Sequence, residues 1–274
     1  MRKLLPRSIK PIRRKISGFL EDRIGSLLGR RDELVPPKRK LFVGGQEDFK
    51  SIGEEFLRYF RELGGLKPNE RVLDVGCGIG RMAVPLTTYL DERGTYEGFD
   101  IVADGIDWCR KKITPKYPNF HFQLADVFNK KYNPNGKYPA SEYHFPYENE
   151  SFDFAFLTSV FTHMLPQDME HYLYETARAL KRNGRCLITF FLLNRESLGH
   201  MHCGRSIYDF KHEGREFRTI DETTPESAVA YDEKFIRGVY GEFGLAIAEP
   251  IHFGSWCGRG KYLSFQDVIL AVKK

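Results

Sequence analysis

Residues 71–81 read RVLDVGCGIGR, a short apolar run that passes into an acid and then into three glycines at every second position. A strand that leads through bare backbone into a helix directs N–H groups and the positive end of the helix toward a ligand. A dinucleotide fingerprint has the spacing GxGxxG, and with Gly76 and Gly78 in its first two positions the third falls on Arg81. Asp74, two residues before the first glycine, suits a ligand with a cationic amine better than one with a pyrophosphate.

A second acid supports the same kind of ligand. Asp100 follows the glycine loop by twenty residues and ends the next predicted strand. A carboxylate in that position can accept hydrogen bonds from both hydroxyls of a ribose. The two acids and the glycines together indicate a cofactor that carries a ribose and an amine but no phosphate.

The chain around this loop alternates between strand and helix patterns. Apolar residues recur at helical spacing from residue 46 to about 63 and again from 166 to 181. The predicted strands are residues 72–75, 95–100, 120–125, 152–160 and 185–193. Such alternation indicates right-handed crossovers and a parallel sheet. Residues 245–253 and 265–272 are joined by a glycine-containing loop, which predicts an antiparallel hairpin at the end of the sheet.

With VLDVGCGIGR and these strand-end acids, residues 46–274 resemble the class I S-adenosylmethionine-dependent methyltransferases. The resemblance implies an α/β fold with a Rossmann-like seven-stranded sheet, mostly parallel, and helices on both faces. It also implies S-adenosylmethionine as the cofactor and methyl transfer as the reaction.

The resemblance carries over to individual positions. It implies that Asp74, Gly76 and Gly78, with Cys77 filling the turn between them, border the methionine part of the cofactor. It implies that Asp100 holds the ribose. The remaining implied contacts are Ile101 on one face of the adenine, Asp126 at its amino group, the backbone of Val127 beside the ring, and Thr158 and Ser159 near the sulfonium. Each acid also has a structural interpretation, since Asp74, Asp100 and Asp126 could each cap a turn or a helix.

His163 is our candidate for a general base, because it follows the fourth predicted strand at the ligand-binding end of the sheet. The alternative is a histidine that only hydrogen-bonds or packs in that loop. No metal is required by this chemistry, and the nearby His200, His202 and Cys203 fit an ordinary polar loop better than a zinc site. The five cysteines contain no CxxC pair, so we expect reduced thiols.

The basic charge lies at the N-terminus. Residues 1–40 contain 13 Lys+Arg and 4 Asp+Glu, a net charge of +9, whereas the remaining residues have a net charge of −4. We expect residues 1–45 to form a basic extension, either an amphipathic helix on an anionic membrane or a loosely packed arm. Few aromatics and an acidic remainder argue against nucleic acid as a partner. The lack of a long apolar run or an export signal predicts a soluble cytoplasmic protein, and the basic extension is the segment that would make peripheral membrane contact.

The acceptor is predicted only by class. The long connections 129–150 and 194–231, together with the loop that carries Trp256, Cys257 and Arg259, are expected to cover its pocket. Their aromatic and hydrogen-bonding residues suit a sugar or another small hydroxylated molecule, which favours transfer to oxygen. Two alternatives stay open: a non-catalytic S-adenosylmethionine-binding scaffold and a nicotinamide-dependent oxidoreductase. The oligomeric state also stays open.

Overall fold

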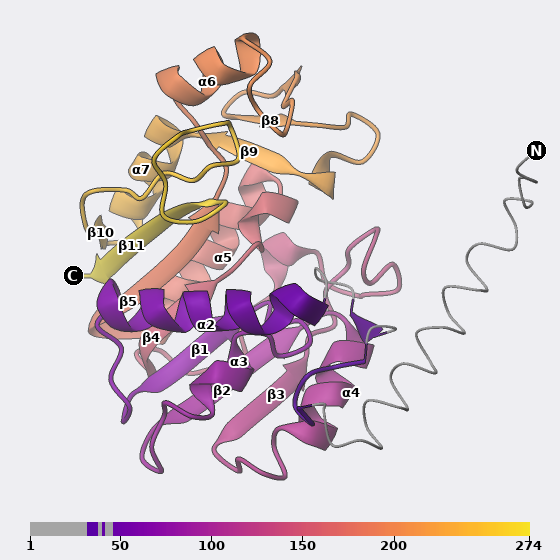
Figure 1. The fold of residues 1–274 in the computed structure, drawn as a ribbon, viewed down its shortest axis with the longest axis vertical. Coiled ribbons are helices and arrows are strands. Elements are labelled where there is room, and N and C mark those ends of the chain that lie inside the picture. Colours follow the sequence, from indigo (N-terminus) through magenta and orange to yellow (C-terminus); the bar gives the residue numbers. More distant parts are fainter. Residues whose placement is uncertain (1–31, 38–39, 42–45) are drawn as a thin grey trace, which may run out of the picture.

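The chain folds around one large mixed sheet. The computed structural model describes residues 32–37, 40–41 and 46–274. The strands of the sheet are β1 (Arg71–Val75), β2 (Thr95–Asp100), β3 (Phe120–Leu124), β4 (Phe152–Leu157), β5 (Leu180–Phe190), β10 (Leu245–Ile247) and β11 (Asp267–Lys273). They lie in the order β10-β11-β5-β4-β1-β2-β3 (Figure 1), and β11 runs against the direction of the others. The predicted seven-stranded, mostly parallel sheet with an antiparallel C-terminal pair is confirmed.

Helices cover both faces of this sheet. One face carries α2 (Gln46–Glu62), α3 (Ala83–Leu86) and α4 (Ala103–Lys112), and the other carries α5 (Pro166–Ala179) and α7 (Glu233–Glu242). Neighbouring residues of one strand enter different cores: Val72 packs with α2, α3 and α4, whereas Leu73 packs with α5 and α7. Strands covered on both sides read as continuous apolar runs, which is why residues 72–75 could be recognised.

Helix α2 follows its apolar periodicity closely. Phe49, Phe56 and Phe60 are buried, and the Phe60 ring stacks on Phe156 of β4 with 4.3 Å between centroids. Each buried phenylalanine contributes on the order of 1.5–3 kcal/mol. The chain leaves the helix through Gly65, whose φ of +60° is a conformation that favours glycine.

The junction between α5 and β5 differs from the prediction. Helix α5 ends at Ala179 and not at residue 181, and β5 begins at Leu180, five residues earlier than expected. The pairing of β4 with β5 shifts register between Phe152 and Phe154, and Asn183 has a φ of +63°. A bulged strand start of this kind leaves no regular period in the sequence. Likewise, β4 ends at Leu157 rather than at residue 160.

A second, smaller sheet lies beyond β5. Its strands are β6 (Leu192–Leu193), β7 (His212–Glu213), β8 (Phe217–Thr219) and β9 (Val229–Asp232), in the order β6-β9-β8-β7, with α6 (Arg195–His202) beside them (Figure 1). The predicted insertion 194–231 therefore supplies β7, β8 and most of β9, which pair with β6 at the end of the strand predicted for residues 185–193. Strands of two to four residues are too short to show a period, so β7, β8 and β9 could not be predicted from the sequence.

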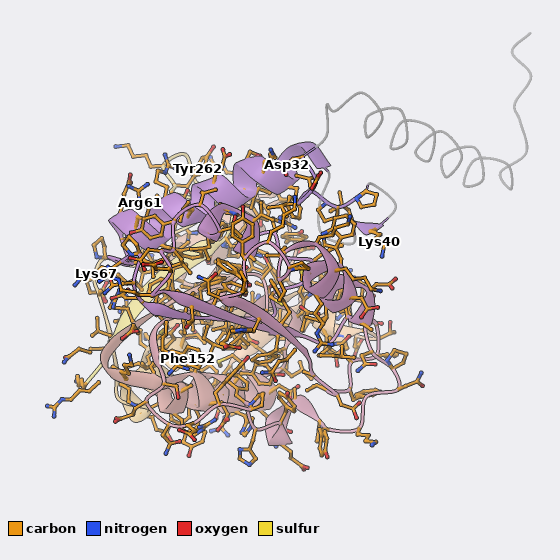
Figure 2. All side chains as sticks on the ribbon, turned by 90° about the horizontal axis from the view of Figure 1, so that it is seen from below. Asp32, Lys40, Arg61, Lys67, Phe152 and Tyr262 are labelled. Carbon is orange, nitrogen blue, oxygen red and sulfur yellow. The ribbon has the colours of Figure 1, made fainter. Side chains whose placement is uncertain are left out.

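The described end of the basic extension packs on the domain. Leu34 and Val35 are buried, and Val35 shares a cluster with Phe49 and with Ile79 of the glycine loop. Asp32 pairs with Lys50 of α2 at 2.6 Å, and Figure 2 shows Asp32 beside the N-terminal end of this helix. The expected amphipathic helix falls within residues 1–31, which lie outside the described residues.

None of the helices described here is long and apolar enough to cross a membrane.

Candidate functional site

The glycine loop is fixed by its neighbours at the carboxyl end of β1. Gly76, Gly78 and Gly80 all have positive φ, at +80°, +58° and +83°. The amides of Gly76 and Cys77 donate to the carbonyl of Phe99 at 2.9 and 3.0 Å. A Cβ atom at position 76 would lie 2.4 Å from Cγ2 of Val160, so both conformation and space require glycine there.

Asp100 holds this loop from the end of β2. Its Oδ2 accepts the amide of Gly78 at 2.7 Å, and its Oδ1 accepts the amide of Val102 at 2.8 Å. Burial raises the pKa of Asp100, and the two amide donors act in the opposite direction. Each oxygen keeps a further lone pair, so the carboxylate can still accept from a ligand hydroxyl.

Asp74 is fully buried and less well supplied with donors. Its Oδ2 accepts the hydroxyl of Tyr96 at 2.5 Å, whereas its Oδ1 has no hydrogen-bond partner among the residues described. Burial raises the pKa of Asp74 to about 8, and the nearby Asp100 carboxylate adds to this effect.

Two cavities border the glycine loop. Both are lined by Gly76, Gly78, Thr158 and Ser159. The first, which we call the Asp74 cavity, has a volume of about 300 Å³. The second, which we call the His163 cavity, has a volume of about 360 Å³ and extends along Asp100, Ile101 and Val127. Thr158 and Ser159, which are predicted to lie near the sulfonium, are part of the wall that the two cavities share. Asp74, predicted near the amine, lines the first cavity, and Asp100, predicted near the ribose, lines the second.

Ser159 is held in an unusual conformation at this common wall. Its φ is +60°, its amide donates to Oγ1 of Thr189 at 2.8 Å, and its hydroxyl donates to Oε1 of Gln266 at 3.0 Å. A non-glycine residue with positive φ costs on the order of 1–2 kcal/mol and persists where surrounding contacts enforce it. The contacts thus fix the end of β4 where both cavities meet.

His163 lines the cavity named after it. The residue lies in a short 3₁₀ helix, Phe161–His163, directly after β4. Its Nδ1 is 2.9 Å from the carbonyl oxygen of Glu226. Because a carbonyl only accepts, Nδ1 carries the ring proton and Nε2 carries the lone pair. Burial lowers the pKa of His163, so the neutral ring dominates at pH 7.

Asp126 lies apart from the other predicted site residues. It does not line either cavity, although the next residue, Val127, does. Its Oδ1 accepts the amide of Lys137 at 3.2 Å, and its side chain is about half exposed. The structure therefore brings together every predicted site residue except Asp126.

The long connections contribute unequally to the cavities. The 129–150 connection supplies Asn129, Lys130 and Tyr132 to the His163 cavity, and the 194–231 insertion supplies Glu226. The end of the loop before β11 supplies the backbone or side chains of residues 264–266 to the Asp74 cavity. These segments form the outer walls.

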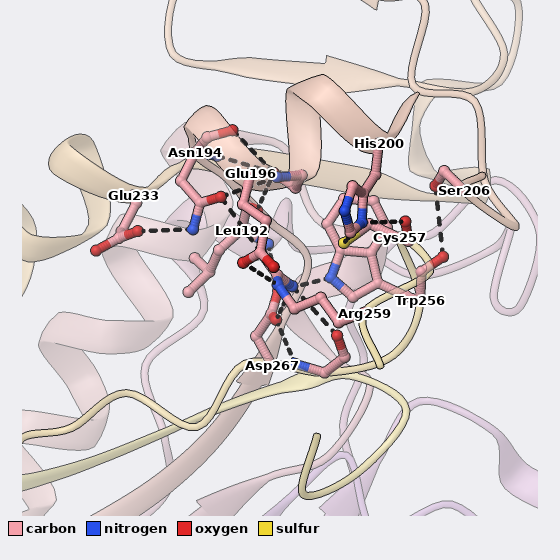
Figure 3. Close-up of polar contacts among 12 residues, drawn as sticks. Leu192, Asn194, Glu196, His200, Ser206, Glu233, Trp256, Cys257, Arg259 and Asp267 are labelled. Carbon is pink, nitrogen blue, oxygen red and sulfur yellow. Dashed lines mark hydrogen bonds and ion pairs between the residues drawn. The ribbon is translucent and has the colours of Figure 1, made fainter. Parts of the chain in front are cut away.

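Trp256, Cys257 and Arg259 line neither cavity, contrary to the expectation that they cover an acceptor pocket. Figure 3 shows Trp256 and Arg259 beside Asp267, which is fully buried, and Cys257 beside His200. The Asp267 carboxylate accepts from Nε1 of Trp256 at 2.7 Å and from Nη1 of Arg259 at 3.1 Å. The bonds to Asp267 hold the loop in place, and Arg259 also lines a third cavity beside Glu196 and Tyr262.

Sequence reasoning missed two residues of the Asp74 cavity region. The hydroxyl of Tyr96 reaches Asp74 past Gly98, where a Cβ would lie 2.9 Å from the phenol oxygen, so the spacing Tyr-x-Gly in β2 was a readable signal. Arg81 lines the cavity. Burial lowers the pKa of Arg81, and the charge of Asp48 acts in the opposite direction. In the sequence, Arg81 indicates only that the loop departs from the dinucleotide fingerprint.

No group of three or more His, Cys, Asp or Glu side chains within the described ranges is arranged to hold a metal ion.

Comparison with known proteins gives a family match over this region. The family described as "Methyltransferase domain" matches residues 66–222. An O-methyltransferase of Penicillium expansum is 30% identical over 148 residues, which cover 52% of this chain and 46% of that protein. The matched regions span between 37% and 57% of the curated relatives' own lengths.

Solved structures share the fold at low sequence identity. A methyltransferase structure from Methanosarcina mazei has a TM-score of 0.53 and 20% identity, and covers 77% of this chain and 95% of its own. Magnesium protoporphyrin IX methyltransferase of Synechocystis, with S-adenosylhomocysteine bound, has a TM-score of 0.53 and 16% identity, and covers 95% and 100% of the two chains.

Proposed function

The chain belongs to the class I S-adenosylmethionine-dependent methyltransferase family, and from this membership we propose that it transfers a methyl group to an oxygen of a small hydroxylated molecule. The O-methyltransferase of Penicillium expansum supports oxygen as the acceptor atom. The single observation that supports the proposal is that His163 lines the cavity next to the glycine loop while its Nδ1 is bonded to the carbonyl of Glu226.

The residues present fit S-adenosylmethionine. The Asp74 cavity offers a buried carboxyl oxygen without a donor, which suits the cofactor's amine. The His163 cavity offers Asp100 for the ribose hydroxyls and the apolar Ile101 and Val127 for the adenine. When bound, this cofactor supplies an electrophilic methyl group on a sulfonium. Gly76 and Gly78 bring bare backbone to the wall that the two cavities share.

His163 would act as the general base for the acceptor hydroxyl. The carbonyl of Glu226 keeps the proton on Nδ1, so Nε2 is the atom that can take a proton. Proton removal by a positioned base contributes about 10²–10⁴-fold to such reactions. Holding the two reactants in line contributes several kcal/mol more, independently of any base.

The outer walls suit an acceptor with an apolar or aromatic body. Phe56 and Phe265 line the Asp74 cavity, and Phe265 is about 40% exposed at its edge. Gln266 offers hydrogen-bonding atoms beside them. A flat hydroxylated molecule could pack on the rings and still hydrogen-bond. A sugar remains within the same proposal, because aromatic faces also bind sugar rings.

The first test is calorimetric titration with S-adenosylmethionine, S-adenosylhomocysteine and NADH. We expect micromolar binding of both adenosyl compounds and none of NADH. Labelled S-adenosylmethionine should then transfer its methyl group to members of a panel of phenols and glycosides. Cofactor binding without transfer to any panel member would favour the non-catalytic scaffold, and binding of NADH alone would overturn the proposal.

The role of His163 has a matched test. His163→Asn keeps an amide N–H at the position of Nδ1, so the bond to Glu226 can remain while the basic atom is lost. We expect turnover to fall by about 10²–10⁴-fold with S-adenosylhomocysteine affinity retained. His171→Gln is the control, since His171 also bonds a carbonyl, that of Tyr143 at 3.0 Å, but lines neither cavity. Equal activity of both variants would remove the base from the proposal.

A further inference from the structure

Asp74 combines complete burial with an incomplete set of hydrogen bonds. Only 1% of the residue is exposed. One oxygen accepts the Tyr96 hydroxyl, and the other is buried with no partner. An ionised carboxylate accepts at about four lone-pair positions, so this environment serves it poorly.

The groups that face Asp74 add no positive charge. They are Tyr96 and Asp100 of β2, Cys77 of the glycine loop, Cys109 of α4 and Tyr147 of the connection before β4. All of these are neutral or anionic. Arg81 lines the same cavity but forms no ion pair with Asp74.

A buried carboxylate without a cation is costly, by several kcal/mol, and such a group keeps its proton instead. The pKa of about 8 for Asp74 agrees with this geometric argument. A protonated Oδ1 leaves one neutral hydroxyl without a partner, which costs less than an ionised Oδ1 without a donor.

We propose that Asp74 is a neutral acid in the free protein and exchanges its proton for the cationic amine of the cofactor. The proton leaves Oδ1 for solvent, the amine stays protonated, and one of its N–H groups donates to Oδ1. No bond of the cofactor is made or broken. This inference rests on the proposed function for its ligand, and it makes Asp74 a determinant of specificity for ligands that carry an amine.

The exchange predicts proton release and a pH-dependent affinity. S-adenosylhomocysteine carries the amine, whereas 5′-methylthioadenosine keeps the adenosine and sulfur without it. Titration of the full-length protein in phosphate and in imidazole, which both buffer near pH 6.5 and differ widely in ionisation enthalpy, should show release of about one proton per S-adenosylhomocysteine at that pH. Its affinity should rise about tenfold per pH unit from about pH 5.5 to 7.5.

The compound without the amine is the internal control. It should release no proton through Asp74, and any pH dependence it shows comes from Asp100 or other groups of the adenosine side. Asp74→Asn, which resembles the neutral acid in shape, should remove the pH dependence of S-adenosylhomocysteine binding and leave 5′-methylthioadenosine binding unchanged.

The outcomes distinguish a failure of the proton exchange from a failure of the proposed function. Binding of S-adenosylhomocysteine with equal enthalpies in the two buffers and a flat pH profile would overturn the proton exchange and leave the proposed function intact. No binding of either compound would overturn both. The wild-type measurements decide the question even where the Asn variant does not fold.

Discussion

Asp74 and Asp100 lie near the ends of adjacent strands, yet the chain surrounds them differently. Asp100 receives one backbone amide on each oxygen, so it anchors the glycine loop in the free protein. Asp74 receives one phenol hydroxyl and keeps one bare buried oxygen. The hydrogen bonds of Asp100 are thus completed by the fold, whereas those of Asp74 are, in our proposal, completed by a ligand. The partners of a motif residue, rather than its type, decide its role.

The largest effect that we expect is on the pH dependence of the free energy of unfolding, which Asp74 should change much more than Asp100. The pKa of Asp74 is raised from 3.8 to about 8, so its contribution to stability is fully present below pH 3.8 and is lost as pH rises through 8. Compared with Asp74→Asn, the free wild-type protein should lose stability between about pH 4 and 8, by up to about 6 kcal/mol, because each pKa unit corresponds to about 1.4 kcal/mol. Urea unfolding of both proteins across this range measures it, and a constant difference would contradict the contrast.

Asp100→Asn should destabilise the free protein. Each Asp100 oxygen accepts an amide, so an Asn side chain must place its NH₂ against the N–H of either Gly78 or Val102. We expect a loss of about 1–3 kcal/mol in the free energy of unfolding. Binding of S-adenosylhomocysteine and 5′-methylthioadenosine should weaken together, because both contain the ribose. Weakening of the amine-bearing compound alone would show that the two acids have been assigned the wrong way round.

Tyr96→Phe removes the Tyr96 hydroxyl, which is the hydrogen-bond donor to Asp74 among the described residues. The ionised form loses its hydrogen bond, so the pKa of Asp74 should rise further and the pH profile of S-adenosylhomocysteine affinity should move upward. The expected loss of stability is about 1 kcal/mol.

Tyr147→Phe is the control for that variant. The Tyr147 hydroxyl is buried with no partner among the described residues, so its removal should be neutral or stabilising. Identical pH profiles for the two variants would mean that the Tyr96 hydroxyl does not act through Asp74.

The smallest effect is expected from deleting residues 1–31. This truncation keeps Leu34 and Val35, which are buried against the domain, so stability and cofactor affinity should match those of the full chain within about 0.5 kcal/mol. If the arm binds anionic membranes, as we propose from its charge, only vesicle binding should fall, in a sedimentation assay with phosphatidylserine vesicles. Unchanged vesicle binding would end the membrane proposal. Extending the deletion to residue 37 should lower the stability as well.

Much of the main sheet was predictable because its central strands are buried on both faces. Val72 and Leu73 must both be apolar, since they enter cores on opposite sides of the sheet. Such an apolar run can be recognised in the sequence without knowing which residues pack against it. The small sheet was not predictable, because β7 has two residues and β8 three. The bulged start of β5 was misread for a related reason: the irregular residues carry no period.

The sequence predicts a ligand-binding loop at Gly76 and Gly78 with one acid before it and a second acid at the end of the next strand, because the residue order shows both acids and backbone of positive φ favours glycine. The sequence could not show which of the two acids receives hydrogen bonds on both oxygens. That depended on Tyr96, on the space left at Gly98 and on the amides of Gly78 and Val102, all brought near the acids by the pairing of β1 with β2 and by the loops that follow. Hydrogen bonding and burial are properties of the assembled neighbourhood, so the charge state of each acid was decided only by the tertiary structure.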